Sequence, residues 1–187
     1  MPATTSDKRS RLIETAAKLA YLRGFRETSL ADIAEAAKVP VGNVYYYFKT
    51  KEEIGEAVVD RLLAQFRAFR EELEQAGSPK ERLLAFVNNI RVRREQLAGG
   101  GCPLGGLCSE LHKEGGALAK KSTALFTEQL SWLEDQFRAA GHRKDSRQLA
   151  VHLFSVFQGI SLVAFSSHDP ELVVMETKRL KDWINAL

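Results

Sequence analysis

Two adjacent stretches decide the fold of this chain: Thr28-Ser-Leu-Ala-Asp-Ile-Ala-Glu-Ala-Ala-Lys38 and Val39-Pro-Val-Gly-Asn-Val-Tyr-Tyr-Tyr-Phe-Lys-Thr-Lys51. In the first stretch, Ser29 and Asp32 have the spacing of a capping box at the start of a helix. The apolar residues that follow recur at helical intervals: Leu30, Ile33, Ala34 and Ala37. This stretch therefore predicts a short helix that ends in a tight turn at 38–40.

The second stretch predicts a helix with a buried face and an exposed face. Val44 and Phe48 lie four residues apart and form the side that packs on the rest of the domain. The residues that point away from this core are Val41, Gly42, Asn43, Tyr46 and Tyr47. Thr50 and Glu53 form a second capping box, which predicts that a further helix begins here. Two short helices joined by a tight turn form a unit that places its second helix in the major groove of DNA.

The amino-terminal quarter of the chain resembles the DNA-binding domain of TetR-family transcriptional regulators. The likeness covers residues 8–51, and its matching segments are Arg11-Leu-Ile-Glu-Thr-Ala-Ala-Lys-Leu19, Gly24-Phe25, Thr28-Ser29, Ile33-Ala34 and 45–51. It implies an all-α protein with a three-helix DNA-binding domain and a helical body that binds an effector and dimerises. Pro40 and Val41 depart from the family pattern, which usually has a capping residue and often a polar or basic residue there. The base preference is therefore left open.

Within this domain, the resemblance places Val41, Gly42 and Asn43 nearest the base edges. Asparagine pairs with adenine through two hydrogen bonds, and valine packs against the methyl group of thymine. Tyr46 is a fourth candidate for the groove. The other residues expected to contact DNA, mainly at phosphates, are Thr28, Ser29, Tyr45, Tyr47, Lys49 and Lys51. For Gly42 and Tyr45, the alternative is a role in packing only. For Lys49, the alternative is a solvated side chain without a DNA contact.

The charge distribution agrees with DNA binding at the amino-terminal end. Residues 1–51 carry nine Lys and Arg against five Asp and Glu, whereas residues 52–187 carry 18 against 19. The net charge of +3 is therefore concentrated where phosphates would be met. A surplus of this size also occurs on solvated surfaces that bind nothing. The motif, and not the charge, therefore carries the prediction of DNA binding.

The pattern of a signal peptide is absent from residues 1–11, which are polar and charged. The longest apolar stretch, 149–165, is shorter than the roughly 20 residues that span a bilayer. Four polar residues interrupt it: His152, Ser155, Gln158 and Ser161. We therefore expect a buried helix in a cytoplasmic protein that has no contact with a membrane.

Beyond the first domain, every periodic segment is helical. Helices are expected over 51–75, 79–97, 103–112, 117–140, 146–166 and 170–187. The clearest break is at Gly99-Gly-Gly101, and no strand pattern or repeat is present. The sequence predicts an all-α protein of about nine helices. A DNA-binding domain is expected at 1–52, and a ligand-binding and dimerisation domain at 53–187.

The helix expected at 146–166 is apolar on most of its circumference, which is more than one neighbouring helix can cover. One face is expected to join the core of its own chain. The other face, with the last helix, is expected to form a four-helix bundle with a second copy, and such a pair would read a palindromic operator. The residues expected at this dimer interface are Leu153, Phe157, Ile160, Val173, Leu180 and Ile184. A fully internal core helix is the alternative.

Both cysteines lie in one glycine-rich segment, Gly99-Gly-Gly-Cys-Pro-Leu-Gly-Gly-Leu-Cys-Ser-Glu-Leu-His112. Pro103 suits the first position of a helix, which puts Cys102 at the cap, where free amides and the helix dipole favour a thiolate. Gly-Cys at this junction resembles a subset of TetR-family members that includes sensors of electrophiles, oxidants or small aromatic compounds. A buried structural cysteine is the alternative. A disulfide with Cys108 is not expected, because six helical residues separate the two by about 9 Å.

An effector pocket in the helical body is implied by the resemblance. The residues expected to contribute to it are Cys102, Cys108, His112, Phe126, Trp132, Phe154 and Gln158. A small apolar or aromatic effector is favoured, because the expected interior contains aromatic walls and no cluster of Arg or Lys. Plain core packing is the alternative for most of the aromatic residues. A metal is not expected, since the two cysteines and His112 lack the spacing of a zinc site.

The motifs of enzymes are missing from the sequence. No glycine-rich phosphate loop or nucleophile elbow follows a strand pattern, so no catalytic residue and no cofactor are expected. The sequence is best interpreted as a ligand-responsive, DNA-binding repressor. It is expected to act as a homodimer on double-stranded, palindromic operator DNA and to leave this operator when a small-molecule effector or an electrophile binds. A helical adaptor that binds only protein and an activator of the same fold are the alternatives.

Overall fold

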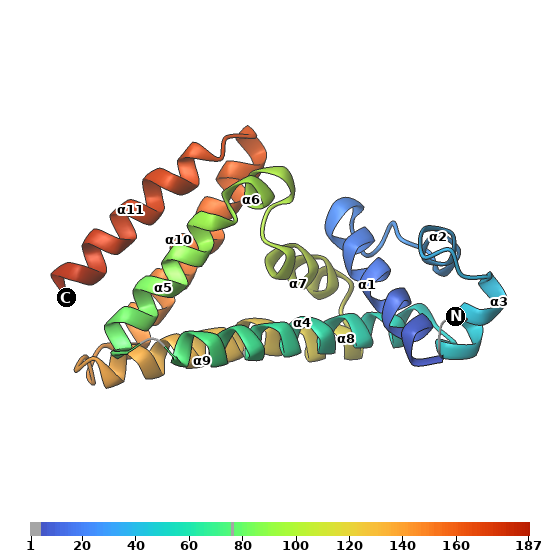
Figure 1. Cartoon of the computed structure of the whole chain (residues 1–187), viewed down its shortest axis with the longest axis horizontal. Helices are drawn as coiled ribbons and strands as arrows, with labels where there is room; N and C mark the ends of the chain where they lie inside the picture. Colours follow the sequence, from blue (N-terminus) through green and yellow to red (C-terminus); the bar gives the residue numbers. More distant parts are fainter. Residues whose placement is uncertain (1–4, 76) are drawn as a thin grey trace. The chain divides into compact units, whose positions relative to one another are not determined.

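The structure, a computed structural model, describes residues 5–75 and 77–187. This part of the chain is all-α, with eleven helices and no strand (Figure 1). The helices are α1 (Thr5–Arg23), α2 (Leu30–Ala36), α3 (Val41–Tyr47), α4 (Lys51–Glu74), α5 (Pro79–Val92), α6 (Arg94–Gly100), α7 (Pro103–Glu114), α8 (Gly116–Ser122), α9 (Ala124–Ala139), α10 (Ser146–Ser167) and α11 (Glu171–Ala186). The predicted all-α fold class is confirmed.

The number of helices exceeds the expected nine because two expected helices are each divided. The segment expected at 79–97 is interrupted at Arg93, whose φ of −88° and ψ of 13° separate α5 from α6. The segment expected at 117–140 is interrupted at Thr123, between α8 and α9. Neither interruption contains a glycine or a proline, so the residue pattern carries no sign of it.

The chain forms two compact units. The first unit contains the described residues up to 65 together with 106–125, and the second unit contains 66–105 and 126–187. Helices α4 and α7 each contain residues of both units. The expected division at 1–52 and 53–187 concerns function and stays a prediction. The compact units differ from it, because part of α4, most of α7 and all of α8 belong with the amino-terminal helices.

In the first unit, α2 packs against both α1 and α3. Ser29 caps α2 as expected. Its hydroxyl oxygen accepts a hydrogen bond from the amide of Asp32 (3.1 Å), and its own amide donates to the Asp32 carboxylate (2.7 Å). The largest fully buried side chains of this region come from all of its first four helices: Leu12, Ile33, Val44, Phe48 and Ile54.

The capping box expected at the start of α4 is present in a modified form. The hydroxyl of Thr50 accepts from the amide of Glu53 (3.2 Å), as a capping residue does. The carboxylate of Glu53, however, accepts from the amide of Lys49 (2.6 Å), one residue before the expected partner. The sequence pattern therefore located the start of the helix correctly, although the Glu53 carboxylate binds the amide of Lys49 and not that of Thr50.

In the second unit, α11 packs against α5, α6 and α10, and α10 also packs against α6. The central helix is α10, whose core residues are Ala150, Leu153, Phe154, Phe157 and Ala164. By length and mean hydropathy, this one helix of the described chain would be able to cross a membrane. Its buried residues nevertheless share one core cluster with those of the neighbouring helices. This arrangement is typical of the central helix of a globular unit.

Candidate nucleic-acid interface

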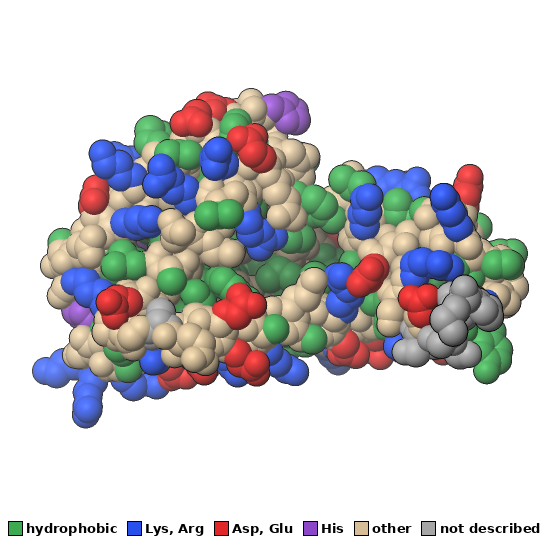
Figure 2. Space-filling model, viewed as in Figure 1, with side chains coloured by type: hydrophobic (Ala, Val, Ile, Leu, Met, Phe, Trp, Pro, Cys, Tyr) green, Lys and Arg blue, Asp and Glu red, His purple; other side chains and the backbone are tan. Residues whose placement is uncertain are grey.

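Helix α3 presents one face to solvent. Val44 is fully buried in the first unit, and this fixes the rotation of the helix about its axis. Val41 is 48% exposed and Tyr46 is 71% exposed. Gly42 is also exposed, and Asn43 is half-buried. The four residues predicted to enter the groove therefore lie on the turns of α3 that the core leaves open, and Figure 2 shows hydrophobic side chains at this end of the unit.

Packing within the chain does not require the glycine at position 42. A Cβ atom built there would meet no atom of the described residues within 4 Å. The alternative that Gly42 serves tight internal packing is therefore excluded. A surface without a side chain at this point lets the backbone of α3 approach a partner closely.

Two residues of the predicted phosphate set have structural roles. Thr28 is buried, and its hydroxyl donates to the carbonyl of Gly24 (2.8 Å). This bond closes the connection between α1 and α2, so Thr28 has a structural role in the first unit, and its contact with a phosphate stays a prediction. Ser29 is exposed, but its hydroxyl is occupied by the cap of α2 through Asp32.

The two lysines after α3 both donate to backbone carbonyls. Lys49 Nζ lies 2.8 Å from the oxygen of Tyr45, and Lys51 Nζ lies 2.6 Å from the oxygen of Arg26. The ammonium of Lys51 also lies 5.0 Å from the centre of the Phe25 ring. Each ammonium has three donors, so these contacts leave hydrogens that can meet a phosphate. Both ammonium groups are thus held by contacts within the first unit.

Aromatic residues cluster in α3 and directly after it. The rings of Tyr46 and Tyr47 pack edge to face with centroids 5.0 Å apart, and Tyr45 is half exposed. Sequence reasoning missed Arg9, whose guanidinium lies 5.1 Å above the ring of Phe48. Only its positive charge marked it in the sequence. Figure 2 shows further Lys and Arg side chains on the visible face of this unit.

One carboxylate near this surface is tied to helix α2. The hydroxyl and the amide of Ser29 donate to Asp32 and hold the pKa of Asp32 below its usual value, with a smaller contribution from the charge of Arg23. The guanidinium of Arg23 lies 3.5 Å from this carboxylate. The negative charge therefore complements the amino terminus of α2 and is partly offset by Arg23.

In the second unit, Cys102 lies at the start of α7, as expected. Its sulfur accepts from the amide of Gly105 (3.4 Å) and from the side-chain amide of Gln158 on α10 (3.5 Å). A Cβ atom at position 105 would lie 2.4 Å from the side-chain oxygen of Gln158, so a larger residue there would displace the Gln158 side chain. The structure thus brings two of the predicted ligand-binding residues, Cys102 and Gln158, into contact.

The three aromatic residues predicted to bind ligand lie in or against the core of the second unit. Phe126 and Phe154 pack edge to face with centroids 5.0 Å apart, and Trp132 lies 5.9 Å from Phe86. The indole Nε1 of Trp132 is buried and has no hydrogen-bond partner among the described residues. Burial of an unpaired donor is costly, so a ligand acceptor at this position would be favourable.

The other two predicted ligand-binding residues belong to the first unit. The Cys108 thiol donates to the carbonyl of Ser122 (3.3 Å). The two ring nitrogens of His112 lie 2.9 Å from the oxygen of Cys108 and 3.2 Å from the hydroxyl of Thr123. The contacts with Ser122 and Thr123 join α7 to the end of α8, and a role of Cys108 and His112 in ligand binding stays a prediction. Both cysteines are free thiols, and the described residues contain no group of three side chains arranged for a metal ion.

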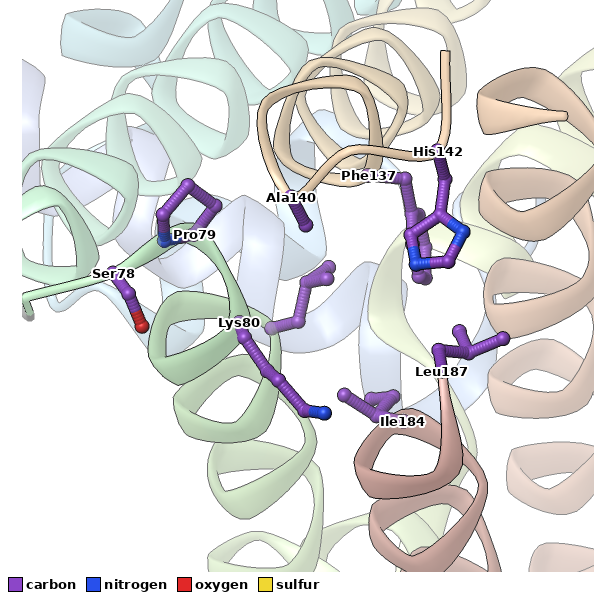
Figure 3. A pocket seen from close by; sticks show the side chains of 9 residues that line it. Ser78, Pro79, Lys80, Phe137, Ala140, His142, Ile184 and Leu187 are labelled. Atoms are coloured by element: carbon purple, nitrogen blue, oxygen red, sulfur yellow. The ribbon is translucent and has the colours of Figure 1, made fainter. Parts of the chain in front are cut away.

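A cavity of about 240 Å³ opens elsewhere in the second unit. It is lined by Ser78, Pro79, Lys80, Leu83, Phe137, Ala140, His142, Ile184 and Leu187 (Figure 3). None of the residues predicted to bind ligand lines this cavity. Its walls come from the start of α5, the end of α9 and the end of α11, and no spacing within a single segment reveals such a set.

The residues predicted at the dimer interface lie mostly inside the second unit. Five of the six are buried in its core: Leu153, Phe157, Val173, Leu180 and Ile184. The sixth, Ile160, is half-buried against this core. The exposed apolar side chains of α10 and α11 are different ones: Val151, Leu162, Val163, Phe165 and Met175. The interface assignment is therefore corrected, because a side chain that is buried in the core of its own chain has no surface left to contact a second copy of the chain.

The geometry of the first unit defines a class of protein. A capped helix, a tight turn and a second helix with one exposed face form a helix-turn-helix DNA-binding domain. Residues 12–58 match the family profile of bacterial regulatory proteins of the tetR family. This match assigns the amino-terminal domain, residues 12–58, to the DNA-binding domains of this family.

Relatives in sequence share about half of their length with this chain. It is 35% identical over 85 residues to the HTH-type transcriptional repressor NemR of Escherichia coli strain K12, over 44% of this chain and 43% of NemR. It is 35% identical over 98 residues to the HTH-type transcriptional regulator TtgR of Pseudomonas putida, over 47% of each. The chain thus spans about half the length of the curated relatives it matches.

Solved structures share the fold of nearly the whole chain. A TetR transcriptional regulator from Legionella pneumophila superposes with a TM-score of 0.85 over 98% of both chains, at 22% identity. The reduced form of E. coli NemR superposes with a TM-score of 0.77 over 94% of this chain and 96% of NemR, also at 22% identity. The helical body after the DNA-binding domain therefore has the fold of these regulators.

Proposed function

We propose that the chain is a sequence-specific, ligand-responsive regulator of transcription that represses genes by binding double-stranded operator DNA in the cytoplasm. The observation that carries this proposal is the exposed face of α3. Val41, Gly42 and Asn43 are turned away from a core that fixes the helix, and position 42 is open to a partner. A protein-only adaptor gives no reason for this surface. The relative NemR, whose name describes a repressor, supports repression over activation.

The regulator acts as a homodimer. Four exposed apolar side chains on α10 and α11 supply a surface for a second copy, and we call them the dimer face: Val151, Leu162, Val163 and Met175. Exposed apolar groups on one surface are typical of interaction sites. A two-fold pair presents two α3 helices to successive major grooves, which matches a palindromic operator.

The effector is a small apolar or aromatic compound, or an electrophile that reacts with Cys102. The supporting contacts are those of Cys102 with Gln158, the aromatic pair at Phe126 and Phe154, and the unpaired indole of Trp132. Effector binding favours one placement of α4, a helix that contains residues of both units, and so changes the spacing of the two DNA-binding domains. Different affinities of effector and DNA for two conformations are sufficient for this response.

Selection of bound fragments from the source genome tests DNA recognition directly. We expect a few fragments that share a palindrome, with affinity at least about 10³-fold above that for random DNA of the same length. Gel shifts at several salt concentrations would measure this ratio. A protein that shifts no fragment, or that shifts all fragments equally, is not a sequence-specific regulator.

A further inference from the structure

Residues 24–29 connect α1 to α2, the helix that packs against α3. Gly24 has a φ of +92°, a conformation that favours glycine. Thr28 closes the connection, because its amide donates to the carbonyl of Phe25 (3.1 Å) and its hydroxyl donates to that of Gly24 (2.8 Å). Helix α2 starts directly afterwards and packs against α3. We call residues 24–29 the α1–α2 loop.

One carboxylate from a distant part of the sequence binds this loop. Glu110 of α7 accepts from the amide of Phe25 through Oε2 (2.8 Å) and from the amide of Arg26 through Oε1 (2.5 Å). Hydrogen bonds to an ionised acceptor are stronger than neutral ones, and two of them fix direction as well as distance. A Cβ atom at Gly24 would lie 3.2 Å from Oε1 of Glu110, so the glycine also leaves room for the carboxylate.

Helices α4 and α8 hold the opposite side of the loop. Lys51 donates to the carbonyl of Arg26 (2.6 Å) and lies over the ring of Phe25. A Cβ atom at Gly55 would lie 2.7 Å from both the Phe25 ring and the Leu118 side chain, so Gly55 admits this ring between α4 and α8. Apolar packing therefore fixes the ring of Phe25, while Glu110 fixes the backbone that carries it.

We propose that Glu110 is a positioning residue for DNA recognition. Its carboxylate sets the α1–α2 loop and, through α2, the orientation of the exposed face of α3. This inference rests on the proposed DNA-binding function and adds a residue that does not touch DNA. Recognition requires side chains held to within about half an ångström, so two lost directional bonds are expected to lower specific affinity. The same helix begins beside Cys102, which links the loop to the proposed effector-binding region by one continuous element.

Two variants of the full-length protein test this proposal. Glu110→Gln and Glu114→Gln each remove one negative charge from α7, but Glu114 is exposed and lies one turn further along. For Glu110→Gln we expect faster hydrogen exchange at the amides of Phe25 and Arg26. We also expect about a tenfold loss of affinity for the selected operator, because a neutral amide replaces a charged acceptor of two hydrogen bonds. Glu114→Gln should match the wild type in both measurements.

Several outcomes would overturn the inference. One is faster exchange at the two amides with wild-type operator affinity, which would make the contact structural only. Another is an affinity loss equal to that of Glu114→Gln, and a third is unchanged exchange. If Glu110→Gln melts well below the wild type, Glu110→Asp is the second variant, because it keeps the charge but shortens the side chain. For either variant, a loss of operator affinity that is fully explained by the fraction of unfolded protein also overturns the proposal.

The proposed function can fail separately. If the wild-type protein prefers no DNA fragment, DNA-binding regulation is wrong. The exchange measurement would still report in that case whether Glu110 holds the amides of Phe25 and Arg26. Fluorescence anisotropy with the selected operator and with random DNA separates the two failures.

Discussion

Asn43 and Lys51 illustrate two tasks that single residues perform at the DNA-binding surface. Asn43 lies in the first turn of α3 on the side left open by the core. Its side-chain amide has a donor and an acceptor, which suit the edge of adenine. The ammonium of Lys51 is held by the carbonyl of Arg26 and has only donors, which suit any phosphate. The first residue is therefore expected to contribute specificity and the second to contribute general affinity.

Replacement of these residues by alanine should separate the two effects. Asn43→Ala should cost about 1 to 3 kcal/mol on the preferred operator and little on random DNA. Lys51→Ala should weaken binding to both by a similar factor and lower the salt slope by about one unit. Anisotropy titrations at several salt concentrations measure both quantities. If Asn43→Ala weakens binding to the operator and to random DNA equally, Asn43 does not contact a base.

The two cysteines should differ in reactivity. Cys102 lies at the start of α7, where its sulfur accepts hydrogen bonds from Gly105 and Gln158. Such bonds and the helix dipole favour a nucleophilic sulfur. The Cys108 thiol instead donates to the carbonyl of Ser122. Timed alkylation of the folded protein, followed by mass spectrometry, should label Cys102 first.

A functional control connects this reactivity to DNA binding. If an electrophile releases wild-type protein from its operator, Cys102→Ser should remain bound under the same treatment, whereas Cys108→Ser should be released. Equal labelling of both thiols, or an unaltered response of Cys102→Ser, would leave Cys102 as a structural helix cap beside a reversible binding site.

At the scale of elements, two capping boxes of the same design begin α2 and α5. In each, a serine hydroxyl accepts from the amide three residues later, and the carboxylate there accepts from the serine amide: Ser29 with Asp32, and Ser78 with Glu81. Both carboxyl pKa values lie below their usual range, because the serine hydroxyl and amide donate to them. One box belongs to the DNA-binding domain and the other to the second unit, so they form a matched pair.

Removal of either cap should destabilise the chain, but only one should affect DNA binding. Ser29→Ala and Ser78→Ala should each lower the melting temperature by about 2 to 4 °C, the usual effect of a lost cap in a protein of this size. Ser29→Ala should also weaken operator binding, since α2 supports α3. Calorimetry and anisotropy measure the two effects. A similar loss of operator affinity in Ser78→Ala would show that the effect is general instability.

At the scale of the whole molecule, assembly should depend on the exposed face of α10. Leu162→Glu should split the dimer and leave the chain folded, because Leu162 is 64% exposed and burial of an unpaired charge between two copies is costly. Val92→Glu, at an exposed apolar position of α5, is the matched control and should remain dimeric. Phe157→Glu should unfold the second unit instead, since Phe157 is in its core. Sedimentation and circular dichroism distinguish these cases.

The opposite results would contradict the proposed assembly. A wild-type chain that remains monomeric at micromolar concentration and still shifts a palindromic operator needs no dimer face. A Leu162→Glu variant that remains dimeric would place the interface on a different surface.

The sequence alone was sufficient to predict those features that depend on interactions between residues close together in the chain. The Ser29 cap, the turn before Pro40 and the four-residue spacing of Val44 and Phe48 depend on backbone hydrogen bonds and helical periodicity, which neighbouring residues determine. The all-α class follows from the same periodicity along the chain. For the same reason, the exposed positions of α3 could be predicted before the structure was known.

Only the tertiary structure decided which apolar side of α10 is buried and what holds the α1–α2 loop. A helix that is apolar nearly all round does not reveal which neighbour covers each side, so Leu153 and Leu162 look equivalent in sequence although one is buried and the other exposed. The contact between Glu110 and the amides of Phe25 and Arg26 joins residues about 85 positions apart. No periodic pattern encodes such a pair, because it forms only when α7 packs beside the amino-terminal helices.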